Sequence, residues 1–493
     1  MRMQLPLRFG APVGGRVRSA VAIAVARGTS YASRATGHHA TALPGFMAER
    51  IDPGILATLG SRHSPIALVI GTNGKTTTTR LLATILERAM GRPVLSNRSG
   101  ANLSQGIVTA LLARSAADAS SPAVFEVDEL AFPRVAAVLR PDVVVILNLV
   151  RDQLDRYGEV DAVERRLVEA FRSLPSASLV VCADDPRLEA VVADAQSHVR
   201  WFGLGDTDAS RSATEEPRIG PSVESAVRAP CPRCGAPTDV DDATASVGAW
   251  RCTACGHRRP PPELAVHSMG SEDGWLRLGF ELRPAADAPS EAGTSDRSAR
   301  DLGRARVRLA GTAGAHDAAA AVLGAIALGL DPGSVVEAID GATPAFGRLE
   351  EVMVGDRTVV LSLAKNPSSV AQAAEAAAIR RPDWLLLGLG DRAADGRDVS
   401  WIWDAHLDAL LRLAPLTLTG SRADDLALRF KYADVHERPP HQPIVDASIE
   451  HALTDALGRI RPGGTLMVLA TYTTLLRIRH VLERRGLATA MPV

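Results

Sequence analysis

A glycine-rich turn between an apolar run and a helix-forming stretch constrains this chain more than any other feature. The apolar run is Ile66 to Ile70, the turn reads GTNG at 71–74, and KTTTTRLLATILERAM follows at 75–90. Glycine lets backbone N–H groups turn toward an anion, and the positive end of a helix favours phosphate. The pattern predicts a buried strand, a phosphate-binding loop and a helix, as found in α/β folds.

The turn also predicts how ATP would be held. Lys75 would reach the terminal phosphates, and the hydroxyl of Thr76 or Thr77 would bind Mg²⁺. Lys75 is the only lysine in the first 364 residues. The general pattern asks for a glycine where this chain has Val69, so the loop is a shortened variant. The alternative is a glycine turn that merely links strand to helix. The expected phosphate-binding residues of the turn are Gly71, Thr72, Asn73, Gly74, Lys75, Thr76 and Thr77.

The length of 493 residues corresponds to about three domains. We expect an N-terminal helical segment (1–60), a central ATP-binding domain (61–340) and a C-terminal Rossmann-like α/β domain (341–493). The net charge of −1 argues against nucleic-acid binding. A long hairpin tip is expected at 284–304, and an exposed loop at 206–230.

Strand-like runs alternate with helical stretches in both α/β domains, which predicts parallel sheets. The runs in the central domain are Ile66 to Ile70, Ala123 to Val127, Val143 to Leu147 and Ser178 to Ala183. Those in the C-terminal domain are Thr358 to Leu363, Trp384 to Leu389 and Thr465 to Leu469.

The N-terminal region predicts an amphipathic helix at residues 15–35. Its apolar stretch, Ala20 to Ala26, is short for a signal peptide, and no run of 18 apolar residues exists to span a membrane. A nucleotide-dependent enzyme belongs in the cytoplasm. We expect the helix to pack on the next domain, with a role on a membrane surface as the alternative.

Two CxxC knuckles have the spacing of a structural zinc ribbon. Cys231 and Cys234 are separated by 17 residues from Cys252 and Cys255. Four thiolates can close a tetrahedron around Zn²⁺ and leave no open position. The alternative is a dithiol redox pair. We expect the ribbon to be an insert at about 226–262, and the fifth cysteine, Cys182, to be an inert core residue.

Polar side chains follow two strands of the central domain. Glu126 ends one strand, where a carboxylate can complete Mg²⁺ coordination opposite the hydroxyl of Thr76, although an acidic strand end can also be a solvated edge. Asn148 follows the next strand and precedes a second polar group. These residues suit a site at the carboxyl edge of the sheet, or helix capping. The second group consists of Asp152, Gln153 and Asp155.

Five segments together resemble the Mur ligase superfamily, whose members make an acyl phosphate from a carboxylate and ATP and capture it with an amine. The resemblance implies that Arg348 joins Lys75 and Mg²⁺ in neutralising the phosphoryl group. The five segments are GTNGKTTT at 71–78, the strand ending at Glu126, Asn148 with DQLD, ADDP at 183–186 and FGRLE at 346–350.

Several departures from the general Mur ligase pattern make the chain resemble the MurT family of lipid II isoglutaminyl synthase subunits. No lysine lies between Lys75 and Lys365 to act as a carbamylated metal ligand, and the residues before the turn are too few for a UDP-sugar domain. One departure counts against the resemblance: members commonly have asparagines where this chain has Gly314 and Asp317, so no adenine contacts are assigned there. The chain reads SLAKNP at 362–367 in place of DYAHNP, and DGRDVSWIWD at 395–404.

This resemblance implies ATP-dependent amidation of the D-isoglutamate α-carboxylate of the lipid II stem peptide at the inner membrane surface. Ammonia would come from a GatD-type glutaminase partner in a heterodimer. The partner's Cys/His pair lacks an acid, and the resemblance assigns that catalytic role to Asp398, with Asp395 as runner-up. The neighbouring Trp401 and Trp403 suit a partner surface. Alternatively, both tryptophans anchor a core and Asp398 caps a helix that starts near Ser400.

Two other functions stay open from the sequence. One is a stand-alone Mur or folylpolyglutamate type ligase that acts on a soluble substrate. The other is a nucleotide-binding scaffold whose zinc ribbon docks proteins. The missing metal-site lysine favours the ammonia-fed enzyme over the stand-alone ligase.

Overall fold

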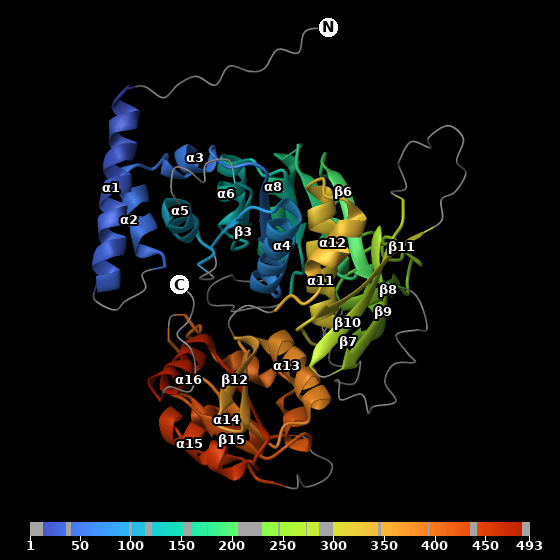
Figure 1. Cartoon of the computed structure of the whole chain (residues 1–493). Helices are drawn as coiled ribbons and strands as arrows, with labels where there is room; N and C mark the ends of the chain where they lie inside the picture. Colours follow the sequence, from blue (N-terminus) through green and yellow to red (C-terminus); the bar gives the residue numbers. More distant parts are fainter. Residues whose placement is uncertain are drawn as a thin grey trace.

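A computed structural model gives the fold of this chain. The residues that it describes are 13–35, 41–97, 101–113, 121–150, 160–174, 176–205, 229–244, 247–272, 274–284, 299–343, 347–392, 394–433 and 441–485. The chain builds two α/β units, one above the other in Figure 1, with the C-terminal unit in orange and red.

The first unit contains a nine-stranded sheet. All of its strands are parallel to their neighbours except β10, which is antiparallel to both of its neighbours. This confirms the parallel α/β core predicted from the alternating runs. In spatial order the strands are β11 (Arg300–Val307), β10 (Trp275–Leu282), β9 (Leu264–Glu272), β6 (His198–Leu204), β5 (Ser178–Cys182), β4 (Val143–Ile146), β1 (Ile66–Ile70), β3 (Ala123–Glu126) and β2 (Leu95–Ser96).

Helices cover this sheet because its central strands are apolar on both faces. Every residue of β1, β3 and β4 is buried, as expected for strands sandwiched between helices. The helices of this unit are α4 (Lys75–Met90), α5 (Ser104–Ala113), α6 (Phe132–Leu139), α8 (Val160–Arg172), α9 (Pro186–Val192), α11 (Gly311–Ala327) and α12 (Pro332–Ile339).

Three N-terminal helices lie at the edge of this unit, α1 and α2 beyond α5 and α3 beside α5 and α6 (Figure 1). They are α1 (Val13–Ala35), α2 (Leu43–Ile51) and α3 (Ile55–Gly60). Ala22 and Ala26 of α1 are fully buried in the core of the unit. The predicted helix therefore exists and packs on the next domain as expected.

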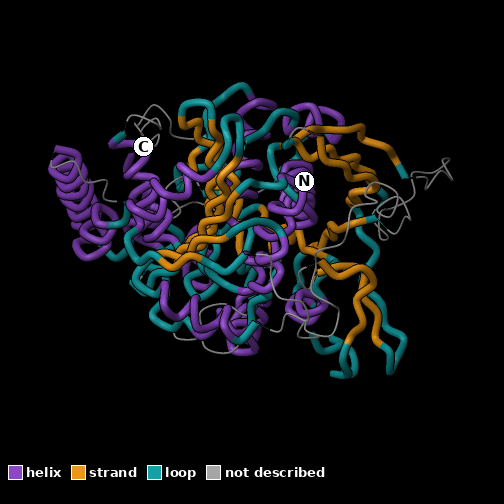
Figure 2. Tube along the Cα trace, turned by 90° about the horizontal axis from the view of Figure 1, so that it is seen from below, coloured by secondary structure: helices purple, strands orange, loops and turns teal. Residues whose placement is uncertain are grey.

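The C-terminal unit has a six-stranded sheet that is parallel apart from β12. Figure 2 looks at this unit from below and shows helices on both sides of the band of strands. In spatial order the strands are β12 (Arg348–Val354), β13 (Arg357–Leu363), β17 (Thr465–Ala470), β14 (Trp384–Gly388), β15 (Leu416–Thr419) and β16 (Ile444–Val445). The helical elements are α13 (Pro367–Arg380), η3 (Ser400–Trp403), η4 (Leu407–Arg412), α14 (Ala423–Lys431), α15 (Ile449–Arg459) and α16 (Tyr472–Arg484).

The predicted strands agree with the observed ones to within one residue at each end. One expectation is wrong in part. Residues 300–304, assigned to a hairpin tip, begin strand β11, which pairs with β10 through the register Leu282 to Arg300. The strand continues into the more apolar residues that follow, so tertiary pairing overrides the polar local sequence. Most of the expected loop at 206–230 lies outside the described residues.

Candidate functional site

The phosphate-binding loop has the predicted strand–turn–helix geometry. It joins β1 to α4, and both glycines have left-handed φ angles, 133° at Gly71 and 86° at Gly74. A Cβ atom at Gly74 would overlap the carboxylate of Asp317 on α11. Glycine is thus needed here both for the turn and for the close approach of α11.

Lys75 is buried inside this loop. Its Nζ donates hydrogen bonds to the carbonyl oxygens of Gly71 and Thr72 and to Glu129 Oε1 at 2.9 Å. A phosphate oxygen offers the same kind of negatively charged acceptor as the Glu129 carboxylate. In this structure Glu129 therefore takes the place of a phosphate oxygen and holds the Lys75 ammonium group inside the loop. The sequence prediction did not give Glu129 a role, although the acidic run EVDE around it was visible.

Thr76 and Glu126 meet, as the predicted Mg²⁺ site requires. The Thr76 hydroxyl donates to Glu126 Oε2 at 2.7 Å, and Asn102 donates to Glu126 Oε1 at 3.3 Å. The Glu126 backbone is fixed by Asn97, which both donates to its carbonyl and accepts from its N–H. A carboxylate and a hydroxyl are ligands that Mg²⁺ accepts. Thr77, the other candidate hydroxyl, is buried within α4.

Asn148 supports the loop from the end of β4. Its Oδ1 accepts from the Asn73 backbone N–H at 3.0 Å, and its Nδ2 donates to the Asn73 carbonyl at 3.1 Å. The side chain of Asn73 is buried, yet its Nδ2 has no partner among the described residues. A buried amide without a partner is costly unless a ligand satisfies it. The three polar residues expected beside Asn148, namely Asp152, Gln153 and Asp155, lie outside the described residues.

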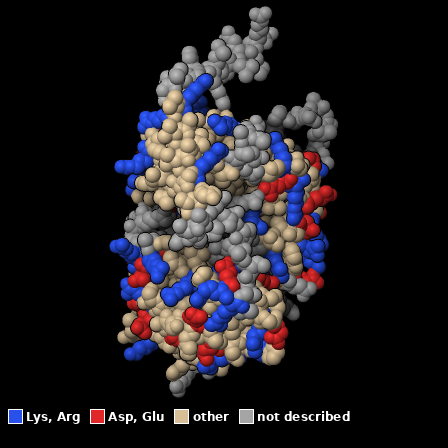
Figure 3. All heavy atoms as spheres, turned by 60° about the vertical axis from the view of Figure 1, so that its left-hand side comes forward, with Lys and Arg blue, Asp and Glu red and all other residues tan. Residues whose placement is uncertain are grey.

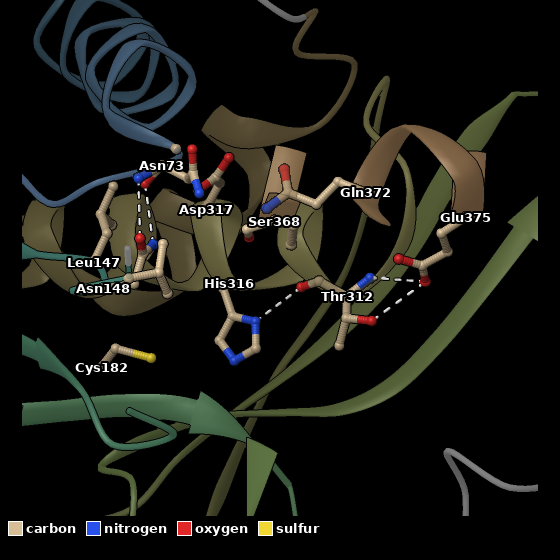
Figure 4. Close-up of a pocket in the computed structure, with 13 residues that line it drawn as sticks. Asn73, Leu147, Asn148, Cys182, Thr312, His316, Asp317, Ser368, Gln372 and Glu375 are labelled. Carbon is tan, nitrogen blue, oxygen red and sulfur yellow. Dashed lines mark hydrogen bonds between the residues drawn. The ribbon is translucent and has the colours of Figure 1, made fainter. Parts of the chain in front are cut away.

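A pocket open to solvent lies beside the loop (Figure 4). It is bounded by the loop, by α11 and by α13, so both α/β units contribute to its wall. Its lining residues are Asn73, Gly74, Leu147, Asn148, Val150, Cys182, Thr312, Ala313, His316, Asp317, Ser368, Gln372 and Glu375.

His316 on the pocket wall is fixed by a buried charge network. Its Nδ1 faces the Thr312 carbonyl at 2.9 Å, and its Nε2 faces Asp184 Oδ2 at 2.7 Å. Both partners are acceptors, so both ring nitrogens donate and the ring is positively charged. Burial opposes this charge, but the hydrogen bond and charge of Asp184 outweigh it and raise the pKa of His316. Burial likewise works against the Asp184 carboxylate, yet His316 and Arg259 lower its pKa.

Cys182 lies next to this network and is fully buried, as predicted. Burial, followed by the charges of Asp184 and Asp185, raises the pKa of its thiol well above the usual value. Cys182, Asp184 and His316 are residue types that bind metals and lie close together. However, Asp184 is already paired with Arg259 and His316, and the Cys182 thiol stays protonated. In this structure the group is part of an ion-paired network.

The four predicted zinc ligands come together beside the β7 (Thr238–Thr244) and β8 (Val247–Cys252) hairpin. The Sγ atoms of Cys231 and Cys255 are 3.8 Å apart, those of Cys234 and Cys252 are 3.5 Å apart, and all four lie within 4.8 Å of one another. Zinc–sulfur bonds of ~2.3 Å in a tetrahedron place sulfurs ~3.8 Å apart. The geometry fits Zn²⁺. The glycines after the knuckles, Gly235 and Gly256, have φ angles of 74° and 71°.

The ribbon is attached to the network around His316. Arg259 follows the second knuckle, donates to Leu204 O at 2.8 Å and forms an ion pair with Asp184. Trp250 on β8 donates from its indole nitrogen to Ala183 O at 3.0 Å. The ribbon therefore contacts the residues that follow β5, Ala183 and Asp184, and Asp184 in turn binds His316 of α11.

Asp317 on α11 lies against the loop at Gly74. Asp317 Oδ1 accepts from the Thr78 hydroxyl at 3.3 Å. Burial raises the pKa of Asp317 to about 7, although the charges of Arg348 and His316 oppose the rise. Arg348, predicted to bind phosphate, is near enough to Asp317 for its charge to act on this carboxyl.

The C-terminal unit reaches the site through α13. Asn366 caps this helix by accepting from the Ser369 N–H, and its Nδ2 donates to Asn73 Oδ1 at 3.3 Å. Glu375 accepts from the N–H and hydroxyl of Thr312, both at 3.3 Å, at the start of α11. Sequence reasoning noticed SLAKNP as a family segment but gave neither Asn366 nor Glu375 a role.

The two acidic candidates for completing a partner's triad differ in exposure. Asp395 is buried and accepts from the N–H and hydroxyl of Thr473. Asp398 is half-buried, and its Oδ1 accepts from the Ser400 N–H at 2.8 Å at the start of η3. This bond engages the first N–H of η3, whereas the cap position itself is Val399, which makes no side-chain cap hydrogen bond. Trp401 packs against the core of the unit, whereas Trp403 is 49% exposed.

Comparisons with known protein families match the two units separately. The Mur ligase middle domain family matches residues 69–222, which include the loop, Glu126 and Asn148. The MurT ligase C-terminal family matches residues 363–475, which include Asn366 and Asp398.

Relatives cover almost the whole chain. The lipid II isoglutaminyl synthase (glutamine-hydrolyzing) subunit MurT of Streptococcus pneumoniae is 29% identical over 449 residues, which are 90% of this chain and 92% of that protein. The subunit of the same name from Staphylococcus aureus strain COL is 29% identical over 474 residues, 95% of this chain and 98% of that protein.

Solved structures of ligases share the fold. A pseudomurein peptide ligase type C from Methanothermus fervidus has a TM-score of 0.63 at 19% identity and covers 85% of this chain and 79% of its own. MurF from Thermotoga maritima, solved in complex with ADP, has a TM-score of 0.59 at 15% identity and covers 87% and 83%. At these identities the likeness establishes the fold alone.

Proposed function

This chain is a member of the MurT family of Mur ligases, and from that membership we propose that it is the synthetase subunit of a lipid II isoglutaminyl synthase. It uses ATP to convert the D-isoglutamate α-carboxylate of the lipid II stem peptide to the amide. The carboxylate attacks the γ-phosphorus of ATP and releases ADP. Ammonia then attacks the acyl carbon and releases phosphate.

One observation carries this proposal beyond the family match. The loop of the Mur ligase segment and Asn366 of the MurT segment meet at Asn73, whose buried Nδ2 has no partner among the described residues. A ligand that supplies an acceptor there would satisfy this amide and contact both units. We therefore propose that the ATP phosphates and the substrate carboxylate bind between the two units.

The residues of the loop take the roles that their chemistry allows. Lys75 exchanges Glu129 for phosphate oxygens, and Arg348 adds a second positive charge beside Asp317. Thr76 and Glu126 would hold Mg²⁺, which offsets the negative charge of the phosphates when bound. Together these groups position the reactants and stabilise charge, and no nucleophilic side chain is required.

The proposed donor of ammonia is a GatD-type glutaminase subunit in a heterodimer. Asp398 supports this better than Asp395, because Asp395 is buried under hydrogen bonds from Thr473. Asp398 is accessible in part, and the exposed Trp403 lies near it along the chain. Asparagine at position 398 could still accept the Ser400 hydrogen bond, which makes the role testable without unfolding η3.

The proposed location is the cytoplasmic face of the membrane, where a lipid-linked substrate and ATP are both available. No helix among the described residues is long and apolar enough to cross a membrane. We propose a peripheral association in which the enzyme works on the membrane without entering it.

The decisive experiment measures ADP release and lipid II amidation with partner, lipid II and glutamine, and then with each omitted. The proposal expects loss of activity on omission of lipid II, and recovery by ammonium when the partner is omitted. Turnover of a soluble amino acid without the partner would instead identify a stand-alone ligase. ADP release that ignores lipid II would identify a scaffold.

Lys75→Ala provides the test of the ATP site. It should abolish amidation even with ammonium as donor, because the phosphates lose their buried positive charge. Lys431→Ala, which removes an exposed lysine on α14, is the matched control and should leave activity unchanged. Substantial ammonium-driven activity in Lys75→Ala would refute the assignment.

A further inference from the structure

Helix α1 exposes three of its larger apolar residues to solvent. Ala22 and Ala26 are fully buried in the core, and Ile23 is partly buried against it. The larger Val17, Val21 and Val25 are 62%, 48% and 37% exposed. A surface helix normally buries its larger apolar side chains and presents polar ones to water. Burial of the alanines explains how the helix is held, but it leaves the valines without a role in folding.

The three valines form one continuous stripe. They are spaced four residues apart, so they lie along one side of the helix on successive turns. Arg16 and Arg18 stand on either side of Val17 in the sequence, and Arg27 follows Val25 by two residues; all three are exposed. An apolar stripe bordered by arginines is the pattern of a helix that lies in the plane of a membrane interface.

The charge of this region has one sign. Residues 1–48 contain six arginines and neither aspartate nor glutamate, although the whole chain is nearly neutral. In Figure 3, which brings this side of the molecule forward, the upper left part shows a tan surface bordered by blue, and red appears lower down and to the right. Exposed valines beside the exposed Arg16, Arg18 and Arg27 are complementary to anionic lipid headgroups.

The helix is held firmly enough to present this stripe. Arg18 Nε donates to the Ile51 carbonyl at 2.5 Å, and the Ser19 hydroxyl donates to Asp52 Oδ2 at 2.6 Å, both at the end of α2. The neighbouring α2 also exposes Leu43 and Phe46, each about half. These contacts fix α1 on the first unit with its valine stripe outward.

We propose that this surface, defined as the α1 stripe (Val17, Val21 and Val25 with Arg16, Arg18 and Arg27), docks the enzyme on an anionic lipid bilayer. This proposal rests on the proposed function, because a lipid-linked substrate brings the enzyme to the membrane. It adds which surface of the enzyme contacts the bilayer. The valines enter the headgroup region while the arginines remain at the level of the lipid phosphates. The bilayer is the occupant favoured here over a second protein, because the arginines suit lipid phosphates and no acidic residue interrupts the region.

Vesicle flotation with the full chain tests this proposal. We expect binding to vesicles that contain phosphatidylglycerol, weak binding to vesicles of phosphatidylcholine alone, and loss of binding at high salt. Each arginine near an anionic surface contributes about fivefold in affinity. The R16Q/R27Q variant should therefore bind about 25-fold more weakly. Val21→Asp should remove most of the remaining binding.

Met353→Asp is the matched control, because Met353 is 58% exposed on β12 in the other unit. It should bind vesicles like the native chain. Circular dichroism and thermal unfolding establish that each variant is folded. Native-like binding by R16Q/R27Q, equal binding to both lipid compositions, or no binding by the native chain would overturn the proposal. A change in oligomeric state with Val21→Asp, without a change in vesicle binding, would identify a second copy as the occupant.

Activity on a water-soluble substrate with ammonium separates this proposal from the proposed function. R16Q/R27Q should retain that activity and lose rate only on lipid II in vesicles. If the native chain binds vesicles but never amidates, the membrane surface stands and the proposed function fails. If it amidates but does not bind vesicles, the opposite holds.

Discussion

Asp317 sits where a negative charge is unfavourable, against the phosphate-binding loop. Its carboxylate occupies the space beside Gly74 that a Cβ atom would need, and burial raises its pKa to about 7. An unfolded chain would release this proton near pH 3.8. Between these values the folded protein holds a proton that the unfolded chain has lost. Stability contributed by the protonated form is therefore fully present below pH 3.8 and is lost as the pH rises toward 7.

The magnitude follows from the size of this rise. A pKa raised from 3.8 to about 7 corresponds to a loss of ~4 kcal/mol above pH 7. The side chain lines a pocket open to water, which screens its charge, so we expect a smaller loss of about 1–2 kcal/mol. Asp317→Asn keeps the shape and the acceptor for Thr78 but carries no charge. It should stabilise the protein by about 1–2 kcal/mol at pH 8 and by little at pH 4.

Urea unfolding followed by tryptophan fluorescence at the two pH values measures this difference. Asp356→Asn, in the exposed turn between β12 and β13, is the control and should show no pH-dependent gain. The same Asp317→Asn substitution should tighten ATP binding at pH 8 more than at pH 6, because the native carboxyl opposes the phosphates only when ionised. A gain in stability that is equal at both pH values, or a loss at pH 8, would refute this reasoning.

Three further predictions concern the partner, the metal and the ribbon. Asp398→Asn should lose glutamine-driven amidation but keep ammonium-driven amidation, and equal failure of both donors would place Asp398 in the synthetase site. Glu126→Gln should raise the Mg²⁺ concentration needed for half-maximal ADP release by at least tenfold, with the Thr76 hydrogen bond still available. Cys252→Ser should lower the bound zinc measured by atomic absorption and weaken ATP binding measured by calorimetry. The reason is that Arg259 in the ribbon binds Asp184, which in turn fixes His316 at the pocket. Unchanged ATP affinity in a zinc-free protein would contradict this link.

The features that the sequence predicted correctly share one property, which is that their geometry is set within a few residues. The strand, glycine turn and helix around Lys75 follow from apolar burial and from φ angles open to glycine. Each CxxC knuckle is a tight turn, and the β7–β8 hairpin, which pairs Thr238 with Cys252, brings the two knuckles together. The prediction failed at residues 300–304, where pairing with β10 forms a strand from locally polar sequence.

The contacts that complete the site join residues far apart in the chain. Asn366 reaches Asn73, and His316 reaches Asp184, only because the packing of whole helices and sheets brings them together. Glu129 was visible as an acidic residue, but its pairing with Lys75 depends on the register of β3 beside β1. Side-chain chemistry alone does not specify such partners.

The sequence by itself determined the parallel α/β core, the phosphate-binding loop and the metal-binding cysteines, because local backbone geometry and alternating burial fix them. Only the tertiary structure decided which distant side chains meet at the pocket, and which face of α1 turns inward. Both rows of that helix are apolar, so its pattern cannot choose between them. Close packing against the neighbouring helices accepts Ala22, Ala26 and part of Ile23, and leaves the valines outside.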